Sequence, residues 1–135
     1  MNPTEYQKLA GRTECNQRDA RVRMDTFSLT SIRLNHAALG LTGEVGELCS
    51  AIEKWIYYGQ GLDRINLIEE LGDCLWYIAL TCNVIGVDLG SVMEANISKL
   101  CKWYPEKYTD RQAAEENRDR QAERKQLEEF REEMH

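Results

Sequence analysis

The sequence predicts an all-α fold, a compact antiparallel four-helix-type bundle with an additional charged C-terminal helix or tail. Long segments carry apolar residues at three- and four-residue steps, and no alternating run is long enough for a strand. The chain has only two prolines, and glycines follow the periodic segments, where helices commonly end. Its 135 residues suit one domain. We expect an all-α domain over residues 1–108 and a charged, helical C-terminal extension over 109–135.

The first helix is predicted from its capping residues. Asn2 can cap, Pro3 suits the first helical position, and Glu5 stands three residues after the cap. The next segment, 16–25, is polar and rich in arginine. We expect it to be a solvated connection, with a fraying helix end as the alternative.

The longest periodic segment predicts a helix from about Ser31 to Tyr58, ended by the glycines that follow it. Gly40, Gly43 and Gly46 interrupt this pattern, and each mid-helix glycine costs about 1 kcal/mol relative to alanine. We therefore expect a neighbouring helix or a ligand to approach this strip closely. A helix break near Gly40 or Gly43 is the alternative.

Two further helices are predicted before the charged tail. Asp63 can cap the first and Gly86 ends it, whereas Asp88 starts the second and Pro105 marks its end. The first of them is expected to turn its apolar residues inward: Ile65, Ile68, Leu71, Leu75, Ile78, Ala79, Cys82 and Ile85.

The chain becomes strongly charged from Asp110 onward, with few apolar residues and no helix breaker. We expect a helix whose weak apolar stripe, Leu127, Phe130 and Met134, docks on a neighbouring helix or subunit. The alternative is a partly disordered, solvated helix.

Composition excludes several classes of partner. A net charge of -6 and a pI near 5.0 argue against a nucleic acid polymer, because such binders usually carry a basic balance. No stretch approaches the roughly 20 apolar residues of a membrane span, so we expect no membrane. The five cysteines are scattered and fit neither a disulfide framework nor a structural zinc site, which indicates a reducing, cytoplasmic setting.

Two acidic motifs stand inside the helical pattern. Glu44 and Glu47 are three residues apart, as are Glu70 and Asp73, and each pair therefore shares a helix face. The predicted turn near Gln60 lies within two residues of their midpoint. In an antiparallel hairpin the two pairs are thus staggered by about 4–5 Å, less than one turn. Four acids can converge at one height in the bundle.

Acids brought together in this way require a cation, because buried acids without partners are costly. Carboxylate oxygens are hard ligands that suit Mg²⁺, or Mn²⁺, rather than zinc or copper. The motifs lack the Glu-x-x-His pattern of di-iron bundles. His36, eight residues before Glu44, is expected to be a core or capping histidine. Trp55 and Trp76 could stack on a base, although aromatic residues at helical spacing are more often core.

The segments Gly43-Glu-Val-Gly-Glu-Leu48 and Glu69-Glu-Leu-Gly-Asp-Cys-Leu-Trp-Tyr77 together resemble the MazG-like members of the all-α nucleoside triphosphate pyrophosphohydrolase superfamily, whose hallmark is ExxE on one helix and ExxD on the next. Leu34–Leu41, Asn96–Leu100 and Tyr104-Pro105 extend the similarity, which covers roughly residues 3–108.

This resemblance implies hydrolysis of a nucleoside triphosphate between its α and β phosphates, with Mg²⁺. It implies that Glu44, Glu47, Glu70 and Asp73 hold the metal, and that Glu47 or Glu70 positions the attacking water. It further implies that the substrate is bound by Asn96, Lys99 and Tyr104. It also implies a homo-dimer or homo-tetramer.

The chain departs from the family pattern at Trp103, where relatives commonly have an arginine. Lys102 is an imperfect substitute, since lysine lacks the bidentate fork of arginine. Lys54 and the arginines of segment 16–25 (Arg18, Arg21 and Arg23) are further candidates for phosphate contacts. A non-enzymatic helical assembly protein that retains the metal-binding fold is the alternative function. The complete set of four acids favours the enzyme, and Trp103 favours the alternative.

Overall fold

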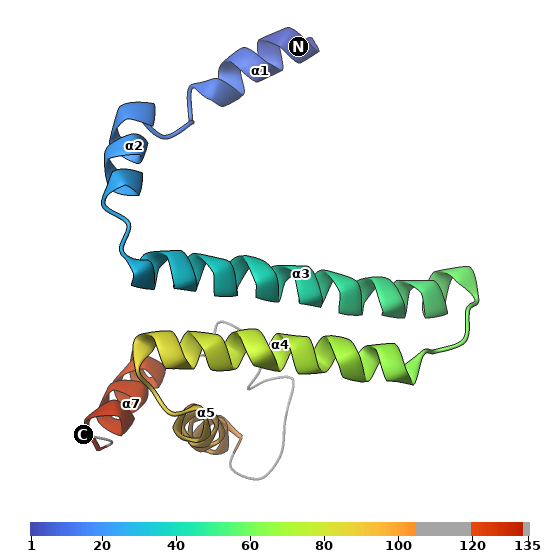
Figure 1. The fold of residues 1–135 in the computed structure, drawn as a ribbon, viewed down its shortest axis with the longest axis vertical. Coiled ribbons are helices and arrows are strands. Elements are labelled where there is room, and N and C mark those ends of the chain that lie inside the picture. The colour runs from blue at the N-terminus through green and yellow to red at the C-terminus, as the bar shows by residue number, and fades with distance from the viewer. Residues whose placement is uncertain (105–119, 134–135) are drawn as a thin grey trace. The chain divides into compact units, whose positions relative to one another are not determined.

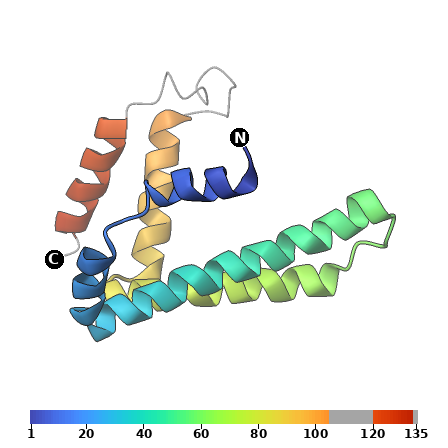
Figure 2. The same cartoon turned by 90° about the horizontal axis from the view of Figure 1, so that it is seen from above.

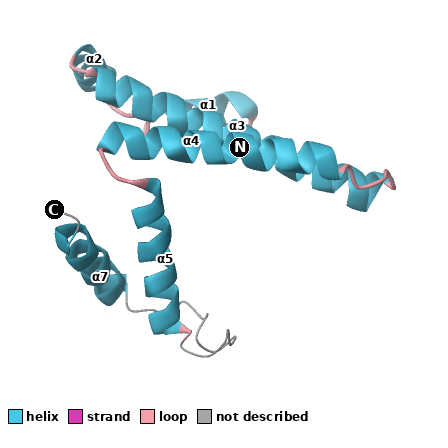
Figure 3. Ribbon diagram, turned by 60° about the horizontal axis from the view of Figure 1, so that its bottom comes forward, coloured by secondary structure: helices cyan, strands magenta, loops and turns pink. Residues whose placement is uncertain are grey.

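The computed structural model describes residues 1–104 and 120–133. Every regular element within them is an α-helix, which confirms the predicted all-α class (Figure 3). Two compact units, Met1–Thr81 and Cys82–His135, make up the chain. The helices are α1 (Pro3–Gly11), α2 (Gln17–Asp25), α3 (Leu29–Tyr58), α4 (Arg64–Ile85), α5 (Leu89–Trp103) and α7 (Arg120–Glu133).

Helix α1 begins as the capping residues predict. The Asn2 side chain accepts a hydrogen bond from the backbone N–H of Glu5 at 2.8 Å, and Pro3 occupies the start of the helix. None of its residues is buried.

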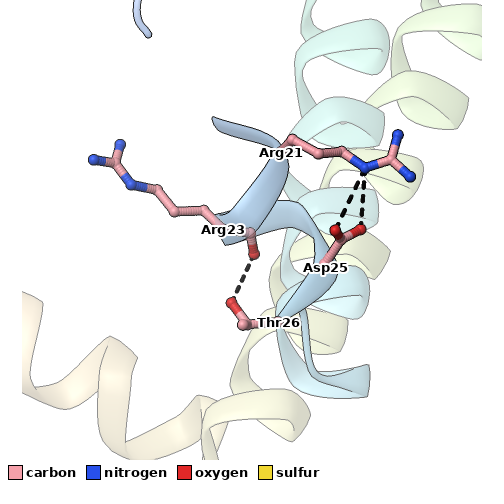
Figure 4. Close-up of polar contacts among 4 residues, drawn as sticks. All are labelled: Arg21, Arg23, Asp25 and Thr26. Atoms are coloured by element: carbon pink, nitrogen blue, oxygen red, sulfur yellow. Dashed lines mark hydrogen bonds and ion pairs between the residues drawn. The ribbon is translucent and has the colours of Figure 1, made fainter. Parts of the chain in front are cut away.

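The segment predicted to be a solvated connection is in fact helix α2, so that prediction was wrong. The Asn16 side chain accepts hydrogen bonds from the backbone N–H groups of Arg18 and Asp19 and satisfies donors that a helix start leaves free. Arg21 and Asp25 form an ion pair one turn apart, and the Thr26 hydroxyl donates to the Arg23 carbonyl (Figure 4). Local capping and pairing therefore form a helix that buries no residue.

Helices α3 and α4 run antiparallel, side by side, and form the hairpin that dominates the first unit (Figures 1 and 2). Gly59 ends α3 with a φ of 65°, the left-handed conformation that glycine adopts at little cost. Asp63 caps α4 by accepting hydrogen bonds from the backbone N–H groups of Ile65 and Asn66. Both helix ends agree with the sequence-based prediction.

The glycine strip of α3 has one close neighbour. A Cβ at Gly40 would overlap the ring of Tyr77, whereas one at Gly43 or Gly46 would meet no atom within 4 Å. Close approach by a neighbouring helix is therefore confirmed at Gly40. Among the described residues, no neighbour approaches Gly43 or Gly46 in the same way. The alternative of a helix break is wrong, because α3 is continuous from Leu29 to Tyr58.

The inward face predicted for α4 is wrong for its first half and for Ile85, which is 56% exposed. Ile65, Ile68, Leu71 and Leu75, named here the α4 stripe, are between 52% and 81% exposed. The face toward α3 instead carries Glu70 and Cys74, which are both buried. Because Ile68 and Leu75 lie roughly 140–160° around the helix from Glu70, they point away from α3. Apolar residues cover more of the α4 circumference than one neighbouring helix can bury.

The second unit contains α5 and α7. Asp88 caps α5 through the backbone N–H of Ser91 at 2.8 Å, and Gly86 precedes it with a φ of 73°. α5 ends at Trp103, as predicted, although Pro105 lies outside the described residues. α7 packs on α5, and Gln126 donates a hydrogen bond to the Ser98 hydroxyl at 3.2 Å.

The described part of the tail is helical, in agreement with prediction. Of its predicted apolar stripe, Leu127 is exposed, whereas the side chains of Phe130 and Met134 lie outside the described residues. Residues 110–119 of the predicted helix also lie outside them.

None of the helices in the described residues is, by itself, both long enough and apolar enough to cross a bilayer. Helices α4 and α5 taken together, as a bent pair, have the length and composition of a membrane span.

Candidate metal centre

The register of the hairpin brings the two acidic motifs together. Gly40 precedes Glu44 by four residues, and Tyr77 follows Asp73 by four. The hairpin that sets the Tyr77 ring against Gly40 therefore also sets Asp73 against Glu44, one turn further along. The two acidic motifs therefore lie at the same height along the hairpin, without the stagger that the sequence predicts.

Three of the four predicted acids form a tight group. One carboxylate oxygen each from Glu44, Glu47 and Glu70 lies within 4.8 Å of the other two. Asp73 stands outside this group, although its charge raises the pKa of Glu44. The group therefore draws on both helices, as the spacing predicts.

Glu70 is held in place by a neighbour that the sequence analysis did not single out. It is only 5% exposed, and Asn66 donates a hydrogen bond from Nδ2 to its Oε1 at 2.7 Å. Asn66 lies four residues before Glu70, and residues at this spacing are neighbours on a helix, so the sequence could have predicted this hydrogen bond. This bond fixes the orientation of the Glu70 carboxylate.

Glu44 shows the electrostatic consequence of the arrangement. Its pKa is raised above the ordinary value, first by partial burial and then by the charges of Asp73, Glu47 and Glu70. A hydrogen bond with Glu70 acts in the same direction. Like charges at this distance disfavour ionisation of Glu44, which therefore binds a proton or a cation more readily than an isolated carboxylate.

The donor set fits a divalent metal ion. Within residues 1–104 and 120–133, no lysine or arginine forms an ion pair with the four acids. Three carboxylates from two rigid helices supply hard oxygen ligands and a charge that a divalent cation can neutralise. The cluster can therefore hold a divalent metal ion.

The other predicted site residues lie on α3 and in the second unit. Lys54 is exposed and lies seven residues after Glu47, which returns it to nearly the same face two turns away. On α5, Asn96 and Lys102 are exposed and Lys99 is half-buried. Tyr104 follows as the C-cap, and its N–H donates to the Leu100 carbonyl. Asn96, Lys99 and Lys102 follow one another at three-residue steps along that helix.

Trp103, where the resemblance leads us to expect an arginine, is half-buried. Its Nε1 is enclosed and has no hydrogen-bond partner within the described residues. An indole N–H can only donate, so Trp103 lacks the positive charge and the second donor of an arginine.

Comparisons with known proteins find similarity to a phage protein and to one domain family. Gene 37 protein of Mycobacterium phage L5 is 35% identical over 71 residues, which cover 50% of this chain and 62% of the phage protein. The chain thus spans less than two thirds of that relative. No solved structure matches. The family model of the MazG nucleotide pyrophosphohydrolase domain matches residues 34–108, which is more than half of the chain and includes all four acids. The protein therefore belongs to the family of MazG nucleotide pyrophosphohydrolase domains.

Proposed function

We propose that the protein hydrolyses nucleoside or deoxynucleoside triphosphates to the nucleoside monophosphate and pyrophosphate, with Mg²⁺ or Mn²⁺ as the cofactor. The observation that carries this proposal is the convergence of Glu44, Glu47 and Glu70 within 4.8 Å in a chain of this family. One water molecule is consumed, and the bond between the α and β phosphates breaks.

The acids divide into two roles in this proposal. Glu44, Glu47, Glu70 and Asp73 hold the metal, which neutralises phosphate charge when bound. Glu47 or Glu70 takes the proton of the attacking water. Glu47 is exposed, whereas Glu70 is buried and tied to Asn66. Since a general base must be reached by water, we assign that role to Glu47 and a purely ligating role to Glu70.

Substrate binding is assigned to polar residues outside the acid group. We propose that Asn96, Lys99, Lys102 and Tyr104 contact the phosphates or the sugar, and that Lys54 supplies a further positive charge. The lysines act as point charges on phosphate.

We further propose a homo-dimer or homo-tetramer, with residues 1–108 as the catalytic domain and 109–135 as its extension. The exposed α4 stripe supports the oligomer, because four large aliphatic side chains on one helix face favour a covered state. A cytoplasmic location is supported by five cysteines that are all free.

The test is incubation of the protein with each nucleoside and deoxynucleoside triphosphate and Mg²⁺, with separation of monophosphate and pyrophosphate. Glu47→Gln and Asp73→Asn should each lower turnover by at least about 100-fold, since even indirect partners of a metal cost 10–100-fold. Glu53→Gln is the matched control, because Glu53 is an exposed acid on α3 outside the group. Circular dichroism checks that all variants fold.

The alternative, a non-enzymatic helical assembly protein, is supported by Trp103 and by the exposed α4 stripe. It predicts no pyrophosphate release from any nucleotide, together with oligomers that persist in Glu47→Gln.

A further inference from the structure

Three aromatic rings from two helices meet beside the acid group. His36 of α3 lies 5.8 Å from the Tyr77 ring and 6.5 Å from the Trp76 ring of α4, measured between ring centroids. Trp76 and Tyr77 are 4.8 Å apart. All three pairs are edge-to-face, at interplanar angles of 67° to 88°. Each ring therefore contacts its neighbours by an edge, which is a favourable aromatic geometry.

Two rings of this cluster, His36 and Tyr77, lie on the same side of the hairpin as the acids, and the Trp76 ring lies against both of them. On α3, His36 and Glu47 are eleven residues apart and therefore point within about 20° of each other. On α4, Tyr77 follows Asp73 by four residues and shares its face. Along the helix axes, Trp76 lies six residues, or about 9 Å, from Glu70, and His36 lies eight residues, or about 12 Å, from Glu44.

Packing of the hairpin does not account for Trp76. Its side chain remains 56% exposed, and His36 is exposed as well. A tryptophan whose role was to fill the core would be covered. Tyr77 is half-buried and fixed, because the absence of a side chain at Gly40 lets its ring lie directly against α3. Tyr77 thus positions the two exposed rings.

We propose that His36 and Trp76 form the subsite for the base of the nucleotide, an inference that rests on the proposed function. A nucleotide has a charged end, which the metal at the acids neutralises, and an aromatic base at the other end. The sugar and part of the phosphate chain separate the base from the metal-bound phosphates, and a distance of about 9–12 Å is a separation of that size. Exposed aromatic rings bind bases by stacking without selecting one base strongly.

The first experiment compares Trp76→Ala and His36→Ala with wild-type protein on deoxynucleoside triphosphates and on deoxyribose triphosphate without a base. We expect KM for the base-bearing substrates to rise about 5- to 100-fold with kcat little changed, since stacking acts on binding. KM for the base-free substrate should not change. Tyr57→Ala is the control, because Tyr57 is another exposed aromatic residue of the hairpin, 76% exposed and outside the cluster. An equal loss on both substrates, or none, overturns the proposal.

A second experiment needs no hydrolysis, so it separates this inference from the proposed function. A protein with Trp55→Phe and Trp103→Phe retains only Trp76, and we expect a non-hydrolysable deoxynucleoside triphosphate analogue with Mg²⁺ to quench its fluorescence. Trp76→Phe with Trp103→Phe retains only Trp55 and should show no quenching. If the analogue leaves Trp76 fluorescence unchanged, the subsite is wrong, whatever the hydrolysis assay gives. If the analogue quenches Trp76 but no nucleotide is hydrolysed, the subsite stands and the proposed reaction fails.

Discussion

Glu44 is the residue whose chemistry depends most on its neighbours. Burial and three nearby carboxylates raise its pKa, so the folded, metal-free protein binds a proton at Glu44 more tightly than the unfolded chain does. The stabilisation from that proton is full below the ordinary pKa of Glu44 and is lost as pH rises through the raised value. A metal ion at the cluster would replace the proton.

We therefore predict that Glu44→Gln gains stability relative to wild-type protein as the pH is raised from mildly acidic to neutral in the presence of EDTA. Urea unfolding at a series of pH values measures the difference in unfolding free energy. Excess Mg²⁺ should reverse the order, because only the wild-type protein keeps the ligand. Parallel pH profiles for the two proteins would exclude this coupling.

Gly40 and Gly43 differ in what surrounds them, although both lie in the same helix. Gly40→Ala would drive a methyl group into the Tyr77 ring and should destabilise the protein by about 1–3 kcal/mol. Gly43→Ala meets nothing within 4 Å and should stabilise it by up to about 1 kcal/mol, since alanine favours the helix. Urea unfolding of the two variants checks this, and effects of the same sign would contradict the register of the hairpin.

The hairpin as an element depends on how α3 ends. Gly59 has a φ of 65°, and the left-handed region costs other residues roughly 1–2 kcal/mol. We predict that Gly59→Ala lowers the unfolding free energy by about 1 kcal/mol. Gly61→Ala is the control in the same turn, where a Cβ meets nothing within 4 Å and φ is not positive, and it should change stability by less than about 0.5 kcal/mol. Thermal unfolding of both variants and the wild-type protein, followed by circular dichroism, measures these differences in stability.

For the whole molecule, the α4 stripe leads to a prediction about assembly. Full burial of one large aliphatic side chain contributes about 1.5–3 kcal/mol, so an interface that covers the stripe gains substantially. Sedimentation equilibrium should give a multiple of 15.6 kDa for the wild-type protein.

The double variant Ile68→Glu with Leu75→Glu should shift the mass toward 15.6 kDa, because charges in a dry interface are costly. Leu39→Glu, at an exposed leucine of α3 outside the stripe, is the control and should leave the mass unchanged. A wild-type protein that sediments as a monomer would refute the oligomer.

The sequence by itself determined the all-α class, several helix ends and the shared face of the two acids within each motif. These features are local: Asn2, Asp63 and Asp88 cap their own helices, Gly59 ends α3, and the three-residue spacing of the acids fixes their shared face. Helix α2 was missed because a cap and an ion pair can form a helix without an apolar face.

Only the tertiary structure decided which faces meet. The periodicity of α4 shows that apolar residues cover a wide band of its surface. A single neighbouring helix, α3, covers only part of that band, and the periodicity does not show which part. The structure therefore set Glu70 and Cys74 against α3 and left the α4 stripe exposed. The contact of Tyr77 with Gly40, the bond from Asn66 to Glu70 and the rings of His36 and Trp76 arise from that choice of face.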